Sequence, residues 1–182
     1  MILVVAATRR ELDYLDGVAT LVCGIGPVES ALATSAALAH EPPDALVHVG
    51  IAGAQRLPTA TLVIGSEAVY CDVIDPSSSL PRVEREAPDA VLLAKARDAL
   101  PAARVLPVAT TGRVGGGGGA FEVEAMEGFG VLRAAALARV PAVELRAVSN
   151  AVAEPDRARW RIEDALAALA EAVPVLLEAL DA

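Results

Sequence analysis

The chain has 182 residues, of which 54% are hydrophobic, and a formal net charge of −9. This acidic balance and the lack of a basic cluster argue against binding to nucleic acid. No apolar run approaches the roughly 18 residues that a membrane span requires, which argues against membrane insertion. The length suits one domain with a sizeable core, over residues 1–182.

The chain begins with the short apolar run 1–7, and no positively charged segment precedes it. This start predicts a buried first strand and not a signal peptide. With no export signal, the expected location is cytoplasmic.

Apolar runs that alternate with helical patterns predict an α/β fold. The strand candidates are Ile2–Ala7, Thr20–Gly24, Ala45–Gly50, Thr61–Cys71, Arg104–Thr110, Ala120–Ala125 and Ala142–Val148. Several are continuous Val/Ile/Leu/Ala runs, which is typical of strands covered on both faces. Pro27 opens one helix, and an apolar stripe from Ile162 to Leu180 predicts another, which Pro174 is expected to kink. The predicted architecture is a three-layer α/β/α sandwich with a mostly parallel mixed sheet.

Two segments break this alternation. Asp75–Pro88 is rich in proline, serine and charge, and indicates a surface loop or a lid. Gly115–Gly119 is a run of five glycines, whose backbone entropy favours a mobile loop.

The cysteines and histidines give no metal pattern. Cys23 and Cys71 each lie in an apolar run, which favours buried packing over a disulfide or a reactive thiol. His40 and His48 have no metal-ligand spacing to each other or to a cysteine, so no metal site is expected.

Polar residues follow the ends of apolar strands. Met126 and Glu127 lie where a strand gives way to a helix, with Gly128 close behind, and a later strand ends in Ser149-Asn150. A carboxylate and an amide at one sheet edge can hold a polar ring and a planar base.

Earlier in the chain, Glu11 follows the first strand at the start of a helical turn. A solvated carboxylate favoured by the helix dipole is the alternative to a catalytic role. Gly24-Ile25-Gly26 is a strand-to-helix turn that could also cradle an anion, but it lacks the third glycine of a dinucleotide fingerprint. The small residues of Ile51-Ala52-Gly53 let the backbone come close to a ligand.

Together these segments resemble the purine nucleoside phosphorylase/nucleosidase superfamily, and more closely its futalosine hydrolase and methylthioadenosine/S-adenosylhomocysteine nucleosidase branches. The resemblance runs from residue 1 to about residue 175. It implies a nucleoside N-glycosidase with a small-molecule nucleoside substrate and no cofactor. Members of these branches are typically dimers, so the resemblance also implies a homodimer.

The resemblance implies roles for individual residues. Glu11 matches the acid that activates the attacking water. Met126 and Glu127 match the pair that holds the ribose, where a carboxylate stabilises oxocarbenium character. Ile51, Ala52 and Gly53 match the strand end that approaches the ribosyl group. Arg146 and Ser149 are expected to support the site from behind these residues. Arg146 would orient Glu127 or Ser149.

Asn150 departs from the relatives that act on adenine nucleosides, which carry aspartate there. Asparagine cannot protonate a base, but its amide can donate to N7 or to a 6-oxo group. This favours hypoxanthine as the leaving group, and so a futalosine hydrolase of menaquinone biosynthesis. A strand-terminating turn asparagine is the alternative.

His48 and Ile51 stand where bacterial phosphorylases carry an arginine and a serine that hold phosphate. A neutral imidazole and an isobutyl group suit that task poorly, so hydrolysis is expected.

The relatives have a longer segment over the base where this chain has only Thr111–Phe121. Phe121 is the nearest aromatic residue for stacking on a purine. Trp160 lies in a segment, Arg157–Ile162, that looks like the futalosine hydrolase branch, although it can equally staple the last helix onto the sheet. The short segment motivates a non-catalytic nucleoside-binding protein as an alternative, and a methylthioadenosine/S-adenosylhomocysteine nucleosidase is the other.

Overall fold

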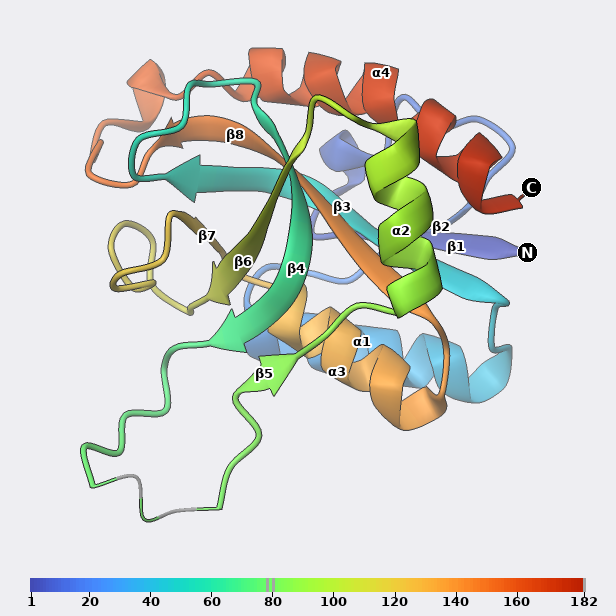
Figure 1. Cartoon of the computed structure of the whole chain (residues 1–182), viewed down its shortest axis with the longest axis horizontal. Coiled ribbons are helices and arrows are strands. Elements are labelled where there is room, and N and C mark those ends of the chain that lie inside the picture. Colours follow the sequence, from blue (N-terminus) through green and yellow to red (C-terminus); the bar gives the residue numbers. More distant parts are fainter. Residues whose placement is uncertain (78, 80, 182) are drawn as a thin grey trace.

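A computed structural model describes residues 1–77, 79 and 81–181, and it places an eight-stranded sheet between two layers of helices (Figure 1). The strands are β1 (Ile2–Ala6), β2 (Ala19–Val22), β3 (Ala45–Ala54), β4 (Leu62–Tyr70), β5 (Arg85–Glu86), β6 (Arg104–Thr110), β7 (Val123–Ala125) and β8 (Ala142–Ala151). The helices are α1 (Pro27–His40), α2 (Ala90–Ala99), α3 (Gly128–Ala138) and α4 (Ile162–Asp181), with short 3-10 turns η1 (Arg9–Glu11) and η2 (Arg157–Arg159). The predicted three-layer sandwich is confirmed.

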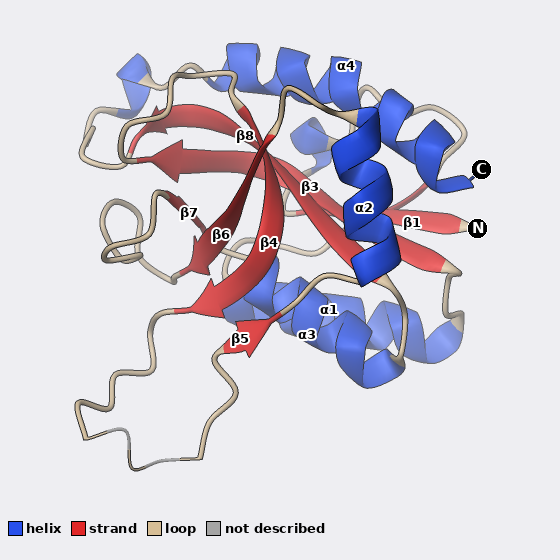
Figure 2. Cartoon of the chain, in the orientation of Figure 1, coloured by secondary structure: helices blue, strands red, loops and turns tan. Residues whose placement is uncertain are grey.

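The sheet is mixed and mostly parallel, as the sequence predicts. Its strand order is β2-β1-β3-β7-β6-β4-β5, and β8 pairs with both β3 and β4. The β3–β7, β4–β8 and β4–β5 pairs are antiparallel, and the others are parallel. β3 pairs with β7, β7 with β6, β6 with β4, β4 with β8, and β8 again with β3. These strands therefore form a closed, barrel-like part of the sheet (Figure 2).

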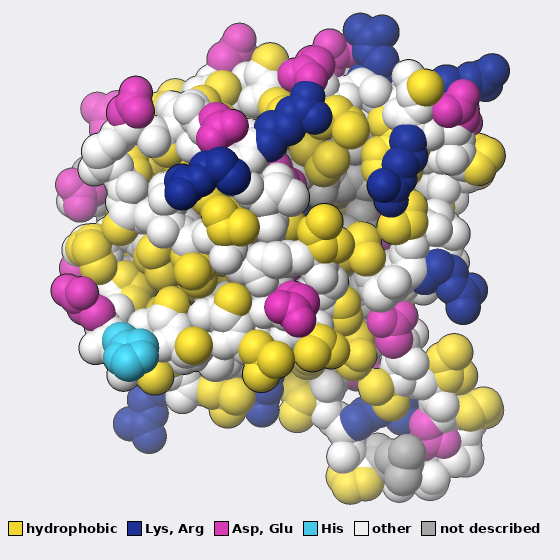
Figure 3. Space-filling view, turned by 180° about the vertical axis from the view of Figure 1, so that it is seen from behind, with side chains coloured by type: hydrophobic (Ala, Val, Ile, Leu, Met, Phe, Trp, Pro, Cys, Tyr) yellow, Lys and Arg dark blue, Asp and Glu magenta, His cyan; other side chains and the backbone are white. Residues whose placement is uncertain are grey.

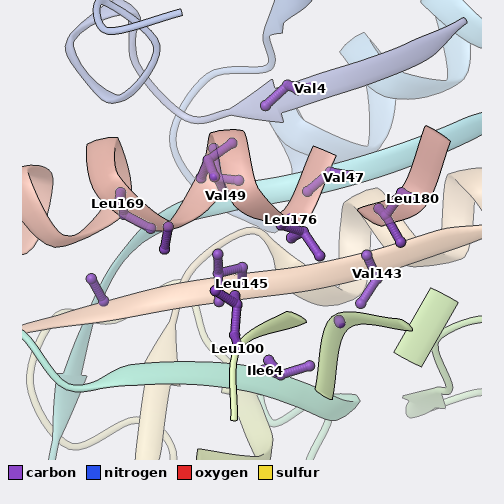
Figure 4. Close-up of a cluster of buried hydrophobic side chains, with 14 of the residues drawn as sticks. Val4, Val47, Val49, Ile64, Leu100, Val143, Leu145, Leu169, Leu176 and Leu180 are labelled. Carbon is purple, nitrogen blue, oxygen red and sulfur yellow. The ribbon is translucent and has the colours of Figure 1, made fainter. Parts of the chain in front are cut away.

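One face of the sheet packs against α4 and α2. Leu169 and Leu176 of α4 lie over Val143 and Leu145 of β8, and all four side chains are fully buried (Figure 4). The apolar stripe predicted for the last helix therefore forms the largest core, and α4 continues through Pro174 to Asp181.

The opposite face is covered by α1 and α3, which lie together below the sheet in Figure 1. A Cβ on Gly130 would lie 2.5 Å from Ser30 Oγ and 2.6 Å from the Pro27 carbonyl oxygen. Gly130 is therefore required by the close contact of the two helices. Its bare backbone packs against α1.

Some boundaries differ from the sequence-based expectation. β3 and β8 run on to Ala54 and Ala151, beyond the expected ends at Gly50 and Val148. The segment Asp75–Pro88 is not loop throughout, because β5 pairs with β4 near its end. Both cysteines are free thiols, Cys23 buried and Cys71 half-buried. Across the described ranges no helix is long and apolar enough to cross a membrane.

Candidate active site

A cavity of about 400 Å³ opens at the edge of the sheet where β1, β3 and β8 end. Most of the residues that the sequence predicts for the site line it: Glu11, Ile51, Ala52, Gly53, Met126, Glu127, Ser149 and Asn150.

Strand pairing brings these distant segments together. β3 and β8 run parallel over their whole lengths, with a register shift between Ala52 and Gly53 that sets Gly53 opposite Asn150. β7 joins the same edge from the other direction and pairs Glu124 with Gly53. The chain leaves β7 at Met126, so the ribose-holding pair predicted from the sequence reaches the cavity.

Glu11 is held by main-chain and side-chain donors. Its Oε2 accepts from Thr8 N at 2.9 Å and from Thr8 Oγ1 at 2.8 Å, while its Oε1 accepts from Ile51 N at 3.1 Å. Only 6% of the residue is exposed. This burial does not fit the alternative of a solvated helix-start carboxylate, and the contacts with Thr8 and Ile51 hold the carboxylate at the cavity.

Glu127 is held in the same way. The tight turn before α1, where Gly26 has φ 96°, presents Gly26 N to Glu127 Oε1 at 3.1 Å. Arg146 Nη1 lies 3.5 Å from the other oxygen, Oε2. Burial raises the pKa of Glu127 above its usual value, and the Arg146 charge and the Gly26 N–H act against that rise.

Asn150 has a defined amide orientation. Its Nδ2 donates to the Ala151 carbonyl oxygen at 3.0 Å, and its Oδ1 accepts from Ser149 Oγ at 2.7 Å. Because a carbonyl oxygen can only accept, the first contact fixes which side of the amide carries nitrogen. Within the described part of the chain Nδ2 has this one acceptor, so its second N–H is available to a ligand.

Two predicted site residues do not line the cavity. Arg146 is 1% exposed and stands behind the cavity wall, where it contacts Glu127 and not the open space. Phe121 does not line the cavity; it faces the guanidinium of Arg85, 5.9 Å from its ring centre. The expectation that Phe121 stacks on a base is wrong, because the turn before β7 directs it toward β5.

Trp160 supplies the aromatic surface of the cavity instead. Its Nε1 donates to the Glu154 carbonyl oxygen at 3.1 Å, and the guanidinium of Arg157 lies 5.4 Å from the ring centre. The segment 157–162, which already resembles the futalosine hydrolase branch, is the sequence signal that drew attention to this tryptophan.

Glu124 is a second lining residue that the sequence reasoning missed. Its Oε1 accepts from Gly116 N and its Oε2 from Gly118 N, both at 2.9 Å. The glycine run predicted to be a mobile loop is thus tied to a buried carboxylate of β7, and Gly115 becomes part of the cavity wall.

His48 is fully buried beside this wall. Its Nδ1 lies 2.9 Å from the Val5 carbonyl oxygen, and Arg146 Nη2 contacts its Nε2. Burial and the Arg146 charge hold the pKa of His48 well below its usual value, so the imidazole is neutral.

Residues 14–125 match the model of a family described as the phosphorylase superfamily. The chain belongs to the phosphorylase superfamily. It is 37% identical over 191 residues to a futalosine hydrolase of Streptomyces coelicolor, in an alignment that covers 91% of this chain and 81% of the relative.

Solved structures share the superfamily fold. A futalosine hydrolase of Helicobacter pylori superposes with a TM-score of 0.87 at 16% identity, covering 97% of each chain. A 5′-methylthioadenosine/S-adenosylhomocysteine nucleosidase of Neisseria meningitidis, in complex with methylthio-immucillin-A, gives 0.85 at 20% identity and covers 97% of this chain and 98% of that one. At these identities the likeness concerns the fold alone.

The hold of Glu124 on the glycine run gives a first prediction for this superfamily member. Glu124→Ala removes two hydrogen bonds to a charged acceptor, each worth about 1.5–3 kcal/mol. We expect amide hydrogen exchange at Gly116 and Gly118 to speed up by at least about tenfold. Glu122→Ala is the matched control, because Glu122 binds Arg56 and Leu57 and not the glycine amides. Equal exchange in both variants would contradict the anchoring role of Glu124.

Proposed function

We propose that this chain is a nucleoside N-glycosidase that hydrolyses futalosine to hypoxanthine and the dehypoxanthinyl product, in the menaquinone biosynthesis of the cytoplasm. The observation that carries the proposal is the convergence of Glu11, Glu127 and Asn150 on one cavity. The 37% identity to a futalosine hydrolase supports the choice of substrate.

The ribose lies against Met126 and Glu127 in this proposal. Cleavage of the C1′–N9 bond leaves positive charge on the sugar, and an ionised carboxylate on the ribose hydroxyls stabilises that charge. Glu127 is already oriented by Gly26 N and Arg146, so it needs no rearrangement to accept hydroxyl hydrogens. The Met126 thioether gives the sugar an apolar face.

Glu11 acts as the base that takes a proton from the attacking water. Its Oε1 is bound by Ile51 N and Oε2 by Thr8, which leaves the remaining lone pairs for water. The water oxygen forms a bond to C1′ as the bond from C1′ to the purine breaks. A proton of that water passes to the Glu11 carboxylate.

Asn150 stabilises the departing base. The free N–H of its amide donates to N7 or to the 6-oxo group of hypoxanthine, which gathers negative charge as the bond breaks. Adenine presents an amino group at position 6, so it lacks the 6-oxo acceptor. This difference favours a 6-oxopurine over adenine.

Water, and not phosphate, is the proposed nucleophile. The imidazole of His48 is neutral and the Arg146 guanidinium lies behind the wall, so neither offers a free cation beside Glu11. The carboxylate of Glu11 would also repel a phosphate dianion.

A substrate panel tests the proposal. Purine release is measured from futalosine, inosine, methylthioadenosine and S-adenosylhomocysteine, first without phosphate and then with it. We expect phosphate-independent release of hypoxanthine from futalosine. Adenine release would instead favour the methylthioadenosine/S-adenosylhomocysteine nucleosidase and overturn the argument from Asn150. Binding of these nucleosides without any release would favour the non-catalytic alternative.

Replacement of Glu11 tests the base. Glu11→Ala should lower kcat by roughly 10²- to 10⁴-fold, because a positioned general base contributes about that much. Asp13→Ala is the control, since Asp13 is an exposed carboxylate two residues away. The rates come from single-turnover release of hypoxanthine, and a near-wild-type rate in Glu11→Ala would remove Glu11 from the mechanism.

We also propose that the protein is a homodimer whose second copy completes the outer end of the cavity. Ile25, Val28 and Leu32 are each more than half exposed, and Ile25 also lines the cavity. Seen from behind, the molecule presents many hydrophobic side chains on the face that α1 occupies (Figure 3). Val28 and Leu32 are four residues apart on α1, so they form one apolar ridge beside the cavity.

Leu32→Glu should therefore dissociate the dimer, because it places a charge in an apolar contact. Val91→Glu is the control, since Val91 is equally exposed but lies on α2. Sedimentation analysis reports the mass of each variant. A wild-type protein that sediments as a monomer would refute the dimer.

A further inference from the structure

A buried polar group lies behind the cavity wall, on the face of β3 and β8 that is turned away from α4. It consists of His48, Glu144 and Arg146, all at most 1% exposed. The parallel register sets His48 opposite Glu144 and Gly50 opposite Arg146. Alternation along each strand places these residues on one face, while Val143 and Leu145 pack under α4.

Two sides of the Arg146 guanidinium are fixed. Its Nε donates to Glu144 Oε1 at 2.7 Å, and its Nη2 donates to His48 Nε2. A guanidinium can only donate and the Val5 carbonyl oxygen can only accept, so the His48 proton must be on Nδ1. The tautomer and the direction of each hydrogen bond follow without ambiguity.

The third nitrogen, Nη1, is left for the catalytic carboxylates. It lies 3.5 Å from Glu127 Oε2. A Cβ on Gly50 would collide with Nη1 and would lie 2.9 Å from Glu11 Oε1. The guanidinium thus lies over the bare backbone of Gly50, beside both carboxylates.

The fold also makes room for Glu144. A Cβ on Gly128 would lie 2.5 Å from Glu144 Oε1, and one on Gly65 would lie 3.1 Å from Oε2. Yet Glu144 Oε2 has no hydrogen-bond partner among the described residues. Such a carboxylate is unusual inside a folded protein, and its one bound oxygen is directed at Arg146.

We propose that Glu144 and His48 are positioning residues for the glycosidic reaction, which hold Arg146 so that Nη1 faces Glu127 and Glu11. The Glu144 carboxylate also partly neutralises the Arg146 charge, which weakens the electrostatic attraction between the guanidinium and Glu127. This inference rests on the proposed function, because it assigns the two residues to the same reaction.

The electrostatic consequence has a definite sign. Burial raises the pKa of Glu127 and the Arg146 charge opposes the rise. Removing the charge of Glu144 leaves more of the Arg146 attraction for Glu127, so the Glu127 pKa should fall. The other groups that act on Glu127 are the Glu11 carboxylate from η1 and the backbone N–H groups of Gly26 and Met126, and all of them remain in the variant.

Glu144→Gln tests the charge. The amide oxygen still accepts from Arg146 Nε, so the shape is kept while the charge is lost. Since Glu127 works ionised, we expect the acidic limb of the kcat/KM profile to move to lower pH. Glu86→Gln is the control: it removes a carboxylate that pairs with Arg133 at 3.1 Å on β5, outside the cavity lining. An unmoved profile in correctly folded Glu144→Gln would overturn the proposal.

His48→Leu and His48→Gln test the hydrogen bond. Glutamine can accept from Arg146 and leucine cannot. We expect leucine to lower kcat by up to about 100-fold through misplacement of Arg146, with a smaller change in KM, and glutamine to restore most of the rate. Equal kcat values in the two folded variants would contradict a positioning role for His48. Thermal unfolding checks the fold of each variant. If His48→Leu does not fold, the pH profile of Glu144→Gln is the test of the proposal.

A failure of the proposed function is distinguished by binding. If the wild type releases no purine from any nucleoside, the affinity for inosine is measured by calorimetry from neutral to acidic pH. An ionised Glu127 holds the ribose, so binding should weaken on acidification, and in Glu144→Gln that weakening should begin at lower pH. Identical pH dependence in the two proteins would overturn the positioning role, whatever the substrate.

Discussion

The site depends on one buried guanidinium. Arg146 lies among the carboxylates of Glu144, Glu127 and Glu11, and together with burial these set its protonation. Burial opposes its charge, but the neighbouring carboxylates outweigh that effect and raise its pKa above the usual value. Loss of Arg146 would leave these buried carboxylates without their cation, so β3, β8 and the start of α3 are tied to one geometry. Gly50 belongs to the same constraint, since no other residue leaves room for the guanidinium.

Main-chain donors fix the two carboxylates that face the cavity. Ile51 N and Thr8 N hold Glu11, and Gly26 N holds Glu127. These amides belong to strand ends and a tight turn, whose positions the sheet determines. The orientation of the carboxylates is therefore set by the backbone before a ligand arrives, which is the condition for electrostatic stabilisation without reorganisation.

The sequence predicts the elements, and most of the site residues that it selects line the cavity, because both depend on local patterns. Strand ends with small or polar residues are visible in one dimension, and parallel pairing brings them to one edge. Within β8, Glu144 and Arg146 alternate with apolar residues, a pattern that usually indicates one solvated face. Here the polar face is buried too, because Arg146 donates both to Glu144 and to His48.

Contacts made by backbone groups alone could not be predicted from the sequence. Glu124 binds amides of glycines, which carry no side-chain signal for a partner. β5 is two residues long in a segment rich in proline, and its pairing with β4 has no pattern of its own. Phe121 was assigned by proximity to the glycine run, but sequence distance does not give the direction of a side chain after a turn. Trp160 lies just before α4, and only the fold shows that this start faces the cavity.

Glycine is required in the run 115–119 for steric reasons as well as for flexibility. A Cβ on Gly117 would lie 2.8 Å from Thr111 Cβ, and one on Gly118 would lie 2.8 Å from Ala109 Cβ. Ordering five glycines is entropically expensive, but Glu124 offsets it with two charge-assisted hydrogen bonds. A loop without side chains can approach the sheet more closely than a loop that carries them. Backbone at Gly115 can then form part of the cavity wall, so this short segment contributes to the site.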